Sequence, residues 1–210
     1  MAITDTKEQI ISKRGYRNNI QGDQYILYLS NYPIAAKYLA SRLNGNTLLE
    51  LCCALGITLE ALSPNFNKLI GVDIDTKVLE DCEKNLQDAG VINKISLIQS
   101  DISDENLLKS FEADVVIYDI PYWVSKELPD GSNVLDKNPD LQEIVTNIRK
   151  YITSNIVIFA PPYMEYFTVK EQLGICEYEQ IYINGRYDRN YIYLGELIRN
   201  NGIIKKDLNY

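Results

Sequence analysis

The stretch Ala113-Asp-Val-Val-Ile-Tyr-Asp-Ile-Pro-Tyr-Trp123 combines a short apolar run with a stiff turn that carries an acid. Residues 113–118 are rich in β-branched side chains and stop before a proline, which predicts a buried strand. Pro121 fixes its own φ and keeps the preceding residue out of the helical region. We therefore expect Asp119 and the neighbouring carbonyl groups to point outward from the carboxyl end of this strand.

Such a turn is suited to holding a planar group that carries an –NH₂. Its carboxylate and carbonyl oxygens can accept the two N–H bonds, while Tyr122 covers the face of the ring. The alternative is an ordinary strand-to-loop turn, because any four-residue motif occurs often by chance. The four residues alone do not distinguish an amine-binding turn from an ordinary one, so the pattern of the remaining chain is needed.

Strands and helices alternate on both sides of this stretch. Apolar runs predict the strands, and helical spacing with capping residues predicts the helices between them. The expected strands are 47–51, 68–73, 94–99, 113–118 and 155–159, and the expected helices are 56–62, 75–90, 104–111 and 140–151. This β-α-β-α order predicts an α/β fold: a Rossmann-like, mostly parallel sheet with helices on both faces.

The two ends of the chain differ from this pattern. Residues 1 to about 25 are expected to form an irregular or helical arm, and Ser30-Asn-Tyr-Pro33 is expected to open a helix. Two strand-like runs, 176–184 and 191–197, are joined by residues 185–188, a connection too short for a helical crossover. They should form a C-terminal antiparallel hairpin at one edge of the sheet.

Composition indicates a globular protein with one main domain. The chain has 210 residues, of which 46% are hydrophobic and 24% charged. It lacks the ~18-residue apolar run of a membrane span and the apolar core of a signal peptide, so no membrane partner is expected. Four cysteines without C-x-x-C spacing predict neither a zinc site nor a disulfide framework, and favour a cytoplasmic location. We expect an N-terminal arm and helix over 1–40 and a Rossmann-like domain over 41–210.

The absence of histidine and the acidic net charge exclude some catalytic mechanisms and disfavour some partners. Without histidine there can be no His-based triad, imidazole base or His-ligated metal, and no metal site is predicted. A net charge of −8 counts against non-specific nucleic-acid binding, although the distribution of charge matters more than its sum. The N-terminal arm is locally basic, and Lys and Arg recur near the other end. A solvated face is the simpler explanation of both groups.

One acid follows each of the first four predicted strands. Ligands bind beyond the carboxyl ends of the strands in an open α/β sheet. A single acid there is more often a cap or turn residue, but four in succession indicate a site; they are Glu50, Asp73, Asp101 and Asp119. A dinucleotide site is disfavoured, because the loop from Glu50 to Gly56 lacks the G-x-G-x-x-G pattern and no P-loop lysine is present.

S-adenosylmethionine fits these acids better, because it carries a sulfonium and an ammonium but no phosphate. Glu50 favours the cationic end of that molecule. Asp73 can accept hydrogen bonds from both ribose hydroxyls, and Asp101 can accept one from the adenine amino group. Ile74 can lie against the adenine ring. The predicted cofactor site is completed by Cys52, Gly56 and Ile102.

The chain resembles the class I S-adenosylmethionine-dependent methyltransferases in the order of four motifs. These are Glu50-x₅-Gly56, Gly71-Val-Asp73, Ser100-Asp101 and Asp119-Ile-Pro-Tyr122. Over about residues 28–200 it is most similar to the trimethylguanosine synthase family, the cap guanine-N2 methyltransferases. This closer likeness includes the helix entry at Ser30, the Cys53-containing loop, and the ending formed by 177–182 and 193–198.

Several positions depart from that family. Two positions that are usually glycine in its first loop are Ala54 and Ile57 here. The family's serine, first proline and stacking tryptophan are replaced by Asp119, Ile120 and Tyr122. Asp-x-Pro-Tyr also resembles the motif of adenine-N6 and ribosomal guanine-N2 methyltransferases, so those acceptors stay open.

The resemblance implies transfer of a methyl group to an exocyclic amino group of a nucleobase, with guanine N2 in RNA as the expected acceptor. It makes residues 41–210 the methyltransferase domain and RNA the expected partner. It implies catalytic roles for Asp119, Pro121 and Tyr122, and substrate contacts by Tyr122, Trp123 and Ser30. The unusual first loop leaves a second reading open, a catalytically inactive S-adenosylmethionine-binding or RNA-interaction module.

Overall fold

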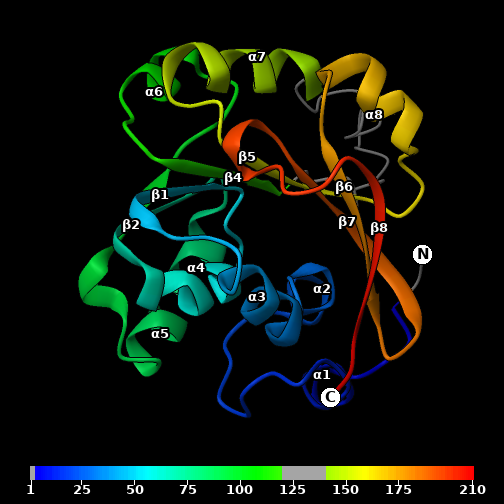
Figure 1. The fold of residues 1–210 in the computed structure, drawn as a ribbon. Coiled ribbons are helices and arrows are strands. Elements are labelled where there is room, and N and C mark those ends of the chain that lie inside the picture. Colours follow the sequence, from blue (N-terminus) through cyan, green and yellow to red (C-terminus); the bar gives the residue numbers. More distant parts are fainter. Residues whose placement is uncertain (1–2, 120–140) are drawn as a thin grey trace, which may run out of the picture. The chain divides into compact units, whose positions relative to one another are not determined.

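The computed structural model describes residues 3–119 and 141–210 (Figure 1). They form two compact units. The first unit comprises Met1–Ile102 with Asn209–Tyr210, and the second comprises Ser103–Leu208. The boundary expected at residue 40 stays a prediction.

Three parallel strands build the sheet of the first unit. They are β1 (Gly45–Leu51), β2 (Phe66–Asp73) and β3 (Ile95–Gln99), and β2 pairs with both of the others. The register places Glu50 opposite Gly71, and Asp73 opposite Gln99. The carboxyl ends of the three strands therefore meet at one edge of the sheet, as the sequence predicts.

Helices precede and follow the strands of the first unit at the predicted places. They are α3 (Pro33–Ala40), α4 (Ile57–Leu62) and α5 (Thr76–Asp88), and the short 3₁₀ turns are η1 (Ser63–Asn65) and η2 (Ile92–Lys94). Pro33 occupies the first turn of α3, where its missing N–H costs nothing. Asp75 caps α5 by accepting hydrogen bonds from the backbone N–H groups of Lys77 at 2.8 Å and Val78 at 3.2 Å.

The N-terminal arm contains two helices, α1 (Lys7–Arg14) and α2 (Gln24–Leu29). Each begins at a side-chain cap: Thr6 forms a capping box with Gln9, and Asp23 accepts from the N–H of Ile26. The buried apolar side chains of the arm belong to one cluster with residues of the first loop, α4 and α5. That cluster includes Ile10, Tyr16, Leu27, Leu55, Ile57 and Val78.

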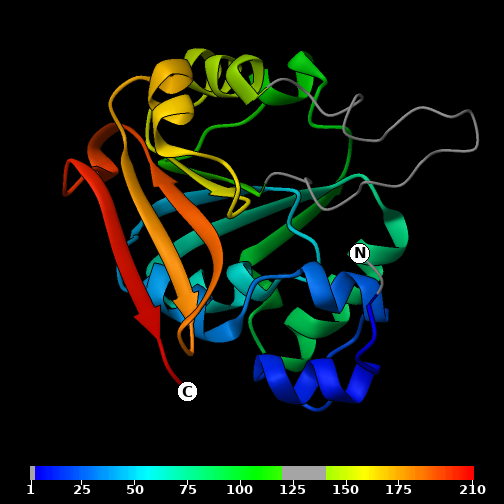
Figure 2. The same cartoon turned by 90° about the vertical axis from the view of Figure 1, so that its right-hand side faces the viewer.

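The second unit continues the α/β pattern with both kinds of pairing. β4 (Val115–Asp119) is parallel to β5 (Ile156–Ala160), and β5 is antiparallel to β7 (Arg186–Tyr193). β6 (Glu177–Ile183) is antiparallel to β7 and parallel to β8 (Gly202–Leu208). Figure 2 shows β8, β6 and β7 side by side in that order.

Three helices of the second unit lie in a row in Figure 1. They are α6 (Glu105–Lys109), α7 (Leu141–Tyr151) and α8 (Tyr166–Leu173), and a 3₁₀ turn, η4 (Gly195–Leu197), follows β7. The α7 helix buries Ile144, Val145 and Ile148, which recur at helical spacing on one face. The predicted α/β fold with a mostly parallel sheet and an antiparallel hairpin is confirmed.

The hairpin differs from prediction in its turn and in what lies beyond it. The turn predicted at 185–188 is wrong: β7 already begins at Arg186, and the turn is Asn184-Gly185. Both turn residues have left-handed φ values, 49° and 74°, as a tight hairpin turn of this type requires. The outer strand β8 and the helix α8 were not predicted.

Candidate active site

The first loop of the first unit folds tightly against β2. Its left-handed residues are Cys52 (φ 63°), Ala54 (φ 45°) and Gly56 (φ 76°). The N–H of Cys53 donates to the carbonyl of Val72 at 3.0 Å, and the N–H of Gly56 donates to the carbonyl of Cys53 at 3.0 Å. The loop therefore turns sharply without a run of glycines.

The two expected glycine positions behave differently. Ala54 holds a left-handed conformation that glycine adopts more easily, so the departure there carries some strain. Ile57 is the first residue of α4, where no glycine is needed.

Asp73 joins this loop to the end of β2. Its Oδ2 accepts from the N–H of Ala54 at 3.0 Å, and its Oδ1 accepts from the N–H of Asp75 at 3.1 Å. A carboxylate can accept about four hydrogen bonds, so two backbone bonds leave capacity for two hydroxyl donors. Burial raises the pKa of Asp73 above its ordinary value, although backbone N–H groups act in the opposite direction.

The Cys53 thiol lies within electrostatic range of two acids, Glu50 and Asp73. Glu50 is 2% exposed in β1. A hydrogen bond with Cys82 and burial raise the pKa of the Cys53 thiol well above its usual range, and the charges of Glu50 and Asp73 raise it further. The raised pKa keeps the Cys53 thiol protonated at neutral pH.

Gly71 permits the close approach of the loop to the sheet. A Cβ on Gly71 would lie 2.7 Å from Leu59 Cδ1, 2.9 Å from Cys53 Sγ and 3.0 Å from Leu97 Cδ2. A side chain there would push on the loop, on α4 and on β3 together. The glycine of the Gly71-Val-Asp73 motif is thus a packing requirement.

The loop after β3 is tied to the same edge. The N–H of Ser100 donates to the carbonyl of Asp73 at 3.0 Å, and Gln99 Nε2 donates to the carbonyl of Ile74 at 3.1 Å. Asp101 is exposed, whereas Ile102 is buried. Ile74 is 62% exposed, which is unusual for so large an apolar side chain. The structure therefore brings together the predicted cofactor residues that follow β1, β2 and β3.

Ser30 is buried within the arm rather than presented on the surface. Its hydroxyl donates to the carbonyl of Ile26 at 2.8 Å. Its own carbonyl accepts from Arg14 Nη1 at 2.8 Å and from the Tyr16 hydroxyl at 3.1 Å. Arg14 also lies over the ring of Tyr32, 4.2 Å from its centroid. Sequence reasoning missed Arg14 and Tyr16, which fix the entry to α3; a substrate contact by Ser30 stays a prediction.

In the second unit, Asp119 ends β4 with a side chain that is 20% exposed. Its Oδ2 lies 4.0 Å from Arg189 Nη1, the limit of an ion pair. Arg189 is 1% exposed, and its Nε donates to Asp188 Oδ2 at 2.7 Å. Sequence reasoning treated the late arginines as surface charge and missed this one. The predicted residues Ile120, Pro121, Tyr122 and Trp123 lie outside the described residues.

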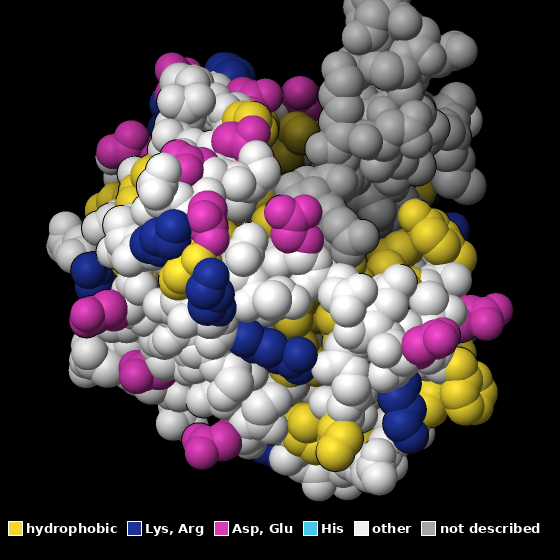
Figure 3. Space-filling view, turned by 90° about the horizontal axis from the view of Figure 1, so that it is seen from above, with side chains coloured by type: hydrophobic (Ala, Val, Ile, Leu, Met, Phe, Trp, Pro, Cys, Tyr) yellow, Lys and Arg dark blue, Asp and Glu magenta, His cyan; other side chains and the backbone are white. Residues whose placement is uncertain are grey.

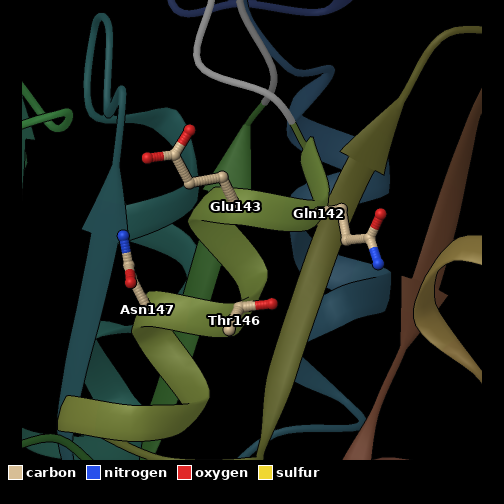
Figure 4. A pocket seen from close by; sticks show the side chains of 4 residues that line it. All are labelled: Gln142, Glu143, Thr146 and Asn147. Atoms are coloured by element: carbon tan, nitrogen blue, oxygen red, sulfur yellow. The ribbon is translucent and has the colours of Figure 1, made fainter.

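Two hollows are lined by residues that the sequence does not predict for the site. One, of about 350 Å³, lies along α7 between polar side chains (Figure 4): Gln142, Glu143, Thr146 and Asn147. The other, of about 460 Å³, is lined by residues of the arm, α3 and α4, including Tyr16, Arg17, Lys37 and Glu60. Neither contains a residue predicted to bind the cofactor or the amine.

Charge and ion binding give little further guidance. On the face in Figure 3, acidic and basic side chains are interspersed. Among the described residues, no group of three or more His, Cys, Asp or Glu side chains could hold a metal ion. No helix in residues 3–119 or 141–210 is both long and apolar enough to cross a membrane.

Comparison with known families adds a chemical class to this geometry. The RMKL-like methyltransferase domain family (UPF0020) matches residues 34–130, slightly less than half of the chain. Residues 34–130 therefore match a methyltransferase domain. This range contains the whole first loop, Asp73, Asp101 and Asp119; Ser30 and Arg189 lie outside it. This match does not show the narrower relationship to trimethylguanosine synthases.

Two curated methyltransferases are similar to parts of the chain. The rRNA N(6)-adenosine-methyltransferase metl-5 of Caenorhabditis elegans is 33% identical over 81 residues, 37% of this chain and 38% of that protein. The ribosomal protein L11 methyltransferase of Tolumonas auensis is 34% identical over 87 residues, 41% of this chain and 28% of that protein. The match thus spans well under half the length of either relative.

The methyltransferase fold extends beyond the matched range. A crystal structure of a “putative methyltransferase” from Porphyromonas gingivalis W83 has a TM-score of 0.67 and 16% identity. The similarity covers 84% of this chain and 43% of that one. At this identity the likeness concerns the fold alone.

Proposed function

We propose that the protein transfers a methyl group from S-adenosylmethionine to the exocyclic amino group of a purine base in RNA. The observation that carries the proposal is the acid at the end of β4: Asp119 closes the strand and the chain continues as Ile-Pro-Tyr. The match of residues 34–130 to a methyltransferase domain supports the reaction class. The rRNA adenosine methyltransferase relative supports an RNA acceptor.

The residues of the first unit fit this cofactor by their chemistry. Acids follow the strands, and the loop from Glu50 to Gly56 contains neither lysine nor arginine. Such a loop suits a molecule with a sulfonium and an ammonium, and would repel the phosphates of a dinucleotide. When bound, S-adenosylmethionine supplies an electrophilic methyl group.

Each residue of the first unit has a defined role in this proposal. Asp73 would accept hydrogen bonds from both ribose hydroxyls, using the capacity that its two backbone bonds leave. Glu50 would attract the cationic end, and Asp101 would accept from the adenine amino group. Ile74, whose side chain is largely exposed, would cover the adenine ring. Cys52, Gly56 and Ile102 would shape the walls.

Asp119 would prepare the acceptor nitrogen, whose lone pair is delocalised into the base and is a poor nucleophile. By accepting an N–H bond, the carboxylate would orient the nitrogen and stabilise positive charge as it becomes tetrahedral. In one in-line displacement, the new nitrogen–carbon bond would form as the carbon–sulfur bond breaks and a neutral thioether leaves. The methylated nitrogen would then lose a proton to Asp119 or to water, so no histidine is required.

Two purine positions are candidates for the acceptor. Guanine N2 follows from the resemblance to trimethylguanosine synthases, which gives Pro121, Tyr122, Trp123 and Ser30 their expected roles. Adenine N6 is favoured by the similarity to the nematode rRNA methyltransferase. Both reactions place the same demand on Asp119, so the proposal of amino-group methylation covers them equally.

A labelling experiment tests the proposal. Purified protein is incubated with S-adenosylmethionine carrying a labelled methyl group and total cellular RNA, and the RNA is digested to nucleosides. We expect label in N2-methylguanosine or N6-methyladenosine. Label in other nucleosides, or only in a parallel ribosomal protein fraction, would contradict the RNA amino-group acceptor. Cofactor binding without transfer to either fraction would favour the inactive binding module.

A further inference from the structure

Arg189 is a buried cation whose place in the fold is set by β7. It lies opposite Ile181 of β6 and is 1% exposed. Removing a guanidinium from water is costly unless carboxylates or hydrogen-bond acceptors replace the water. The burial of this charged side chain therefore needs partners that compensate its charge, and packing alone does not explain it.

A β-bulge brings Asp188 to the side of Arg189. The ladder between β6 and β7 passes from the pair Ile181–Arg189 directly to Tyr182–Tyr187, which leaves Asp188 without a partner in the register. Neighbouring side chains of a regular strand point to opposite faces, whereas a bulge redirects one of them. The Asp188 carboxylate thereby accepts from Arg189 Nε at 2.7 Å.

The other side of the guanidinium faces Asp119. Across the sheet, Asp119 pairs with Phe159 of β5, and Phe159 pairs with Tyr191 of β7. Arg189 lies two residues from Tyr191 on the same strand, so their side chains share a face. Its Nη1 reaches to 4.0 Å from Asp119 Oδ2. The Arg189 guanidinium thus lies between two carboxylates: its Nε faces Asp188 and its Nη1 faces Asp119.

We propose that Arg189 is a positioning residue for Asp119, holding its carboxylate in the orientation that accepts the N–H of the substrate amine. The inference rests on the function proposed above, because it assigns Arg189 no role except through Asp119. The 4.0 Å separation is longer than a hydrogen bond. Between Arg189 Nη1 and Asp119 Oδ2 the attraction is therefore that of opposite charges, and not a direct hydrogen bond.

Lysine could replace this arrangement only in part. A guanidinium offers several N–H donors in a rigid fork, whereas an ammonium is a point charge on a flexible stem. A lysine at position 189 could keep the charge near Asp119 or the bond to Asp188, but not both geometries. Methionine would fill a similar volume and remove the charge.

The test is a double-mutant cycle on methyl transfer to total RNA. Turnover at saturating S-adenosylmethionine is measured for wild type, Arg189→Met, Asp119→Asn and the double variant. We expect Arg189→Met alone to lower turnover about 10²-fold, the scale of misplacing a reacting group by an ångström. In the Asp119→Asn background the same change should lower turnover less than about twofold, because its target is already lost.

Controls separate positioning from folding. Arg186→Met removes an exposed arginine from the same strand and should leave turnover unchanged. Cofactor affinity and thermal unfolding are measured for every variant. If Arg189→Met does not fold, Arg189→Lys replaces it in the cycle, with an expected loss of about tenfold that again disappears beside Asp119→Asn.

Each outcome has one meaning. A loss that appears only when Asp119 is present supports the inference. An equal loss in both backgrounds overturns it and leaves Arg189 as a residue of the fold. Wild-type turnover in Asp119→Asn alone would instead defeat the proposed role of Asp119, whatever Arg189 does.

Discussion

Asp73 and Asp119 end strands in the two units of the molecule, yet the protein holds their carboxylates in different ways. Asp73 is held by backbone N–H groups, at 3.0 Å from Ala54 and 3.1 Å from Asp75. Asp119 lies beside a buried side-chain cation, with Arg189 Nη1 4.0 Å from its Oδ2. The Asp73 carboxylate is bonded to the backbone of a loop, whereas the Asp119 carboxylate is part of a network of charged side chains.

The difference matches the work that each acid would do. Backbone amides fix the Asp73 oxygens rigidly, which suits an acceptor for two ribose hydroxyls whose positions do not change during the reaction. In the proposed reaction, a buried guanidinium would keep a negative charge oriented near a nitrogen that becomes positive only in the transition state. On this account Asp73 acts in binding and Asp119 in turnover.

Replacing Asp119 should have the largest effect. Asp119→Asn keeps the shape of the side chain but loses its charge, so turnover should fall about 10²–10³-fold through lost stabilisation of the developing positive charge. Affinity for S-adenosylmethionine should stay within about twofold, as calorimetry would show. Unchanged turnover would remove Asp119 from the reaction.

Replacing Asp73 should weaken binding instead. Asp73→Ala removes two acceptors of ribose hydroxyl bonds, and bonds to charged groups are each worth about 1.5–3 kcal/mol, so affinity should fall at least about 10²-fold. Asp75→Ala serves as the control next to it. That variant loses the α5 cap and about 1 kcal/mol of stability, with little change in cofactor affinity.

A substitution at Gly71 tests whether the packing of the first loop keeps its backbone N–H in place to hold Asp73. Gly71→Ala places a Cβ 2.7 Å from Leu59 and 2.9 Å from Cys53 Sγ, and overpacking of this kind costs about 2 kcal/mol. It should also weaken cofactor binding, because the loop carrying the Ala54 N–H is pushed away. Thermal unfolding and calorimetry measure the two effects.

Gly90→Ala is the matched control for Gly71→Ala. Gly90 has a left-handed φ of 72° and no atom within 4 Å of an added Cβ, so alanine there adds backbone strain without contact. We expect a loss of about 1 kcal/mol in stability and unchanged cofactor affinity. Equal effects of the two substitutions on affinity would contradict the packing role of Gly71.

The pH dependence of cofactor binding should be the smallest effect. Burial raises the pKa of Asp73 above 3.8, so in the free protein it becomes protonated at a higher pH than an ordinary aspartate. Ribose hydroxyls bind the ionised form; affinity should therefore fall as the pH drops through that raised pKa, by at most about tenfold per pH unit. Asp73→Asn should bind weakly with no such dependence over the same range.

The same shift has an opposite consequence for folding. Because the folded-state pKa of Asp73 is raised, the ionised group disfavours the folded state relative to the unfolded one. Its contribution to stability improves as the pH falls from the raised pKa toward 3.8. Acid should thus weaken cofactor binding at Asp73 while relieving the cost of burying its charge.

The parts of the fold with strong periodicity could be predicted from the sequence. Apolar runs and caps located β1 to β5 and α3 to α7 closely, because these elements are buried on one or both faces. The hairpin turn was misplaced because Asn184-Gly185, a strong turn signal, was overlooked in favour of the next residues. β8 was missed because it is a charged outer strand, in which Lys205 and Asp207 alternate with less exposed residues.

The candidate site was predictable only where it follows from strand order. Acids at the ends of parallel strands must share one edge, and this located Glu50, Asp73 and Asp101 in the first unit. Arg189 could not be found in this way. Its approach to Asp119 depends on the register of β7 against β5, and its bond to Asp188 depends on a bulge in β7. The sequence predicts the antiparallel hairpin but neither the register nor the bulge.

The most direct test of the account is turnover measured against S-adenosylmethionine concentration for Asp73→Ala and Asp119→Asn, with RNA as acceptor. If one acid binds and the other reacts, excess cofactor will restore Asp73→Ala to within about threefold of wild type and will leave Asp119→Asn at least about 10²-fold slow. Restoration of Asp119→Asn by excess cofactor, or a permanently slow Asp73→Ala, would contradict it.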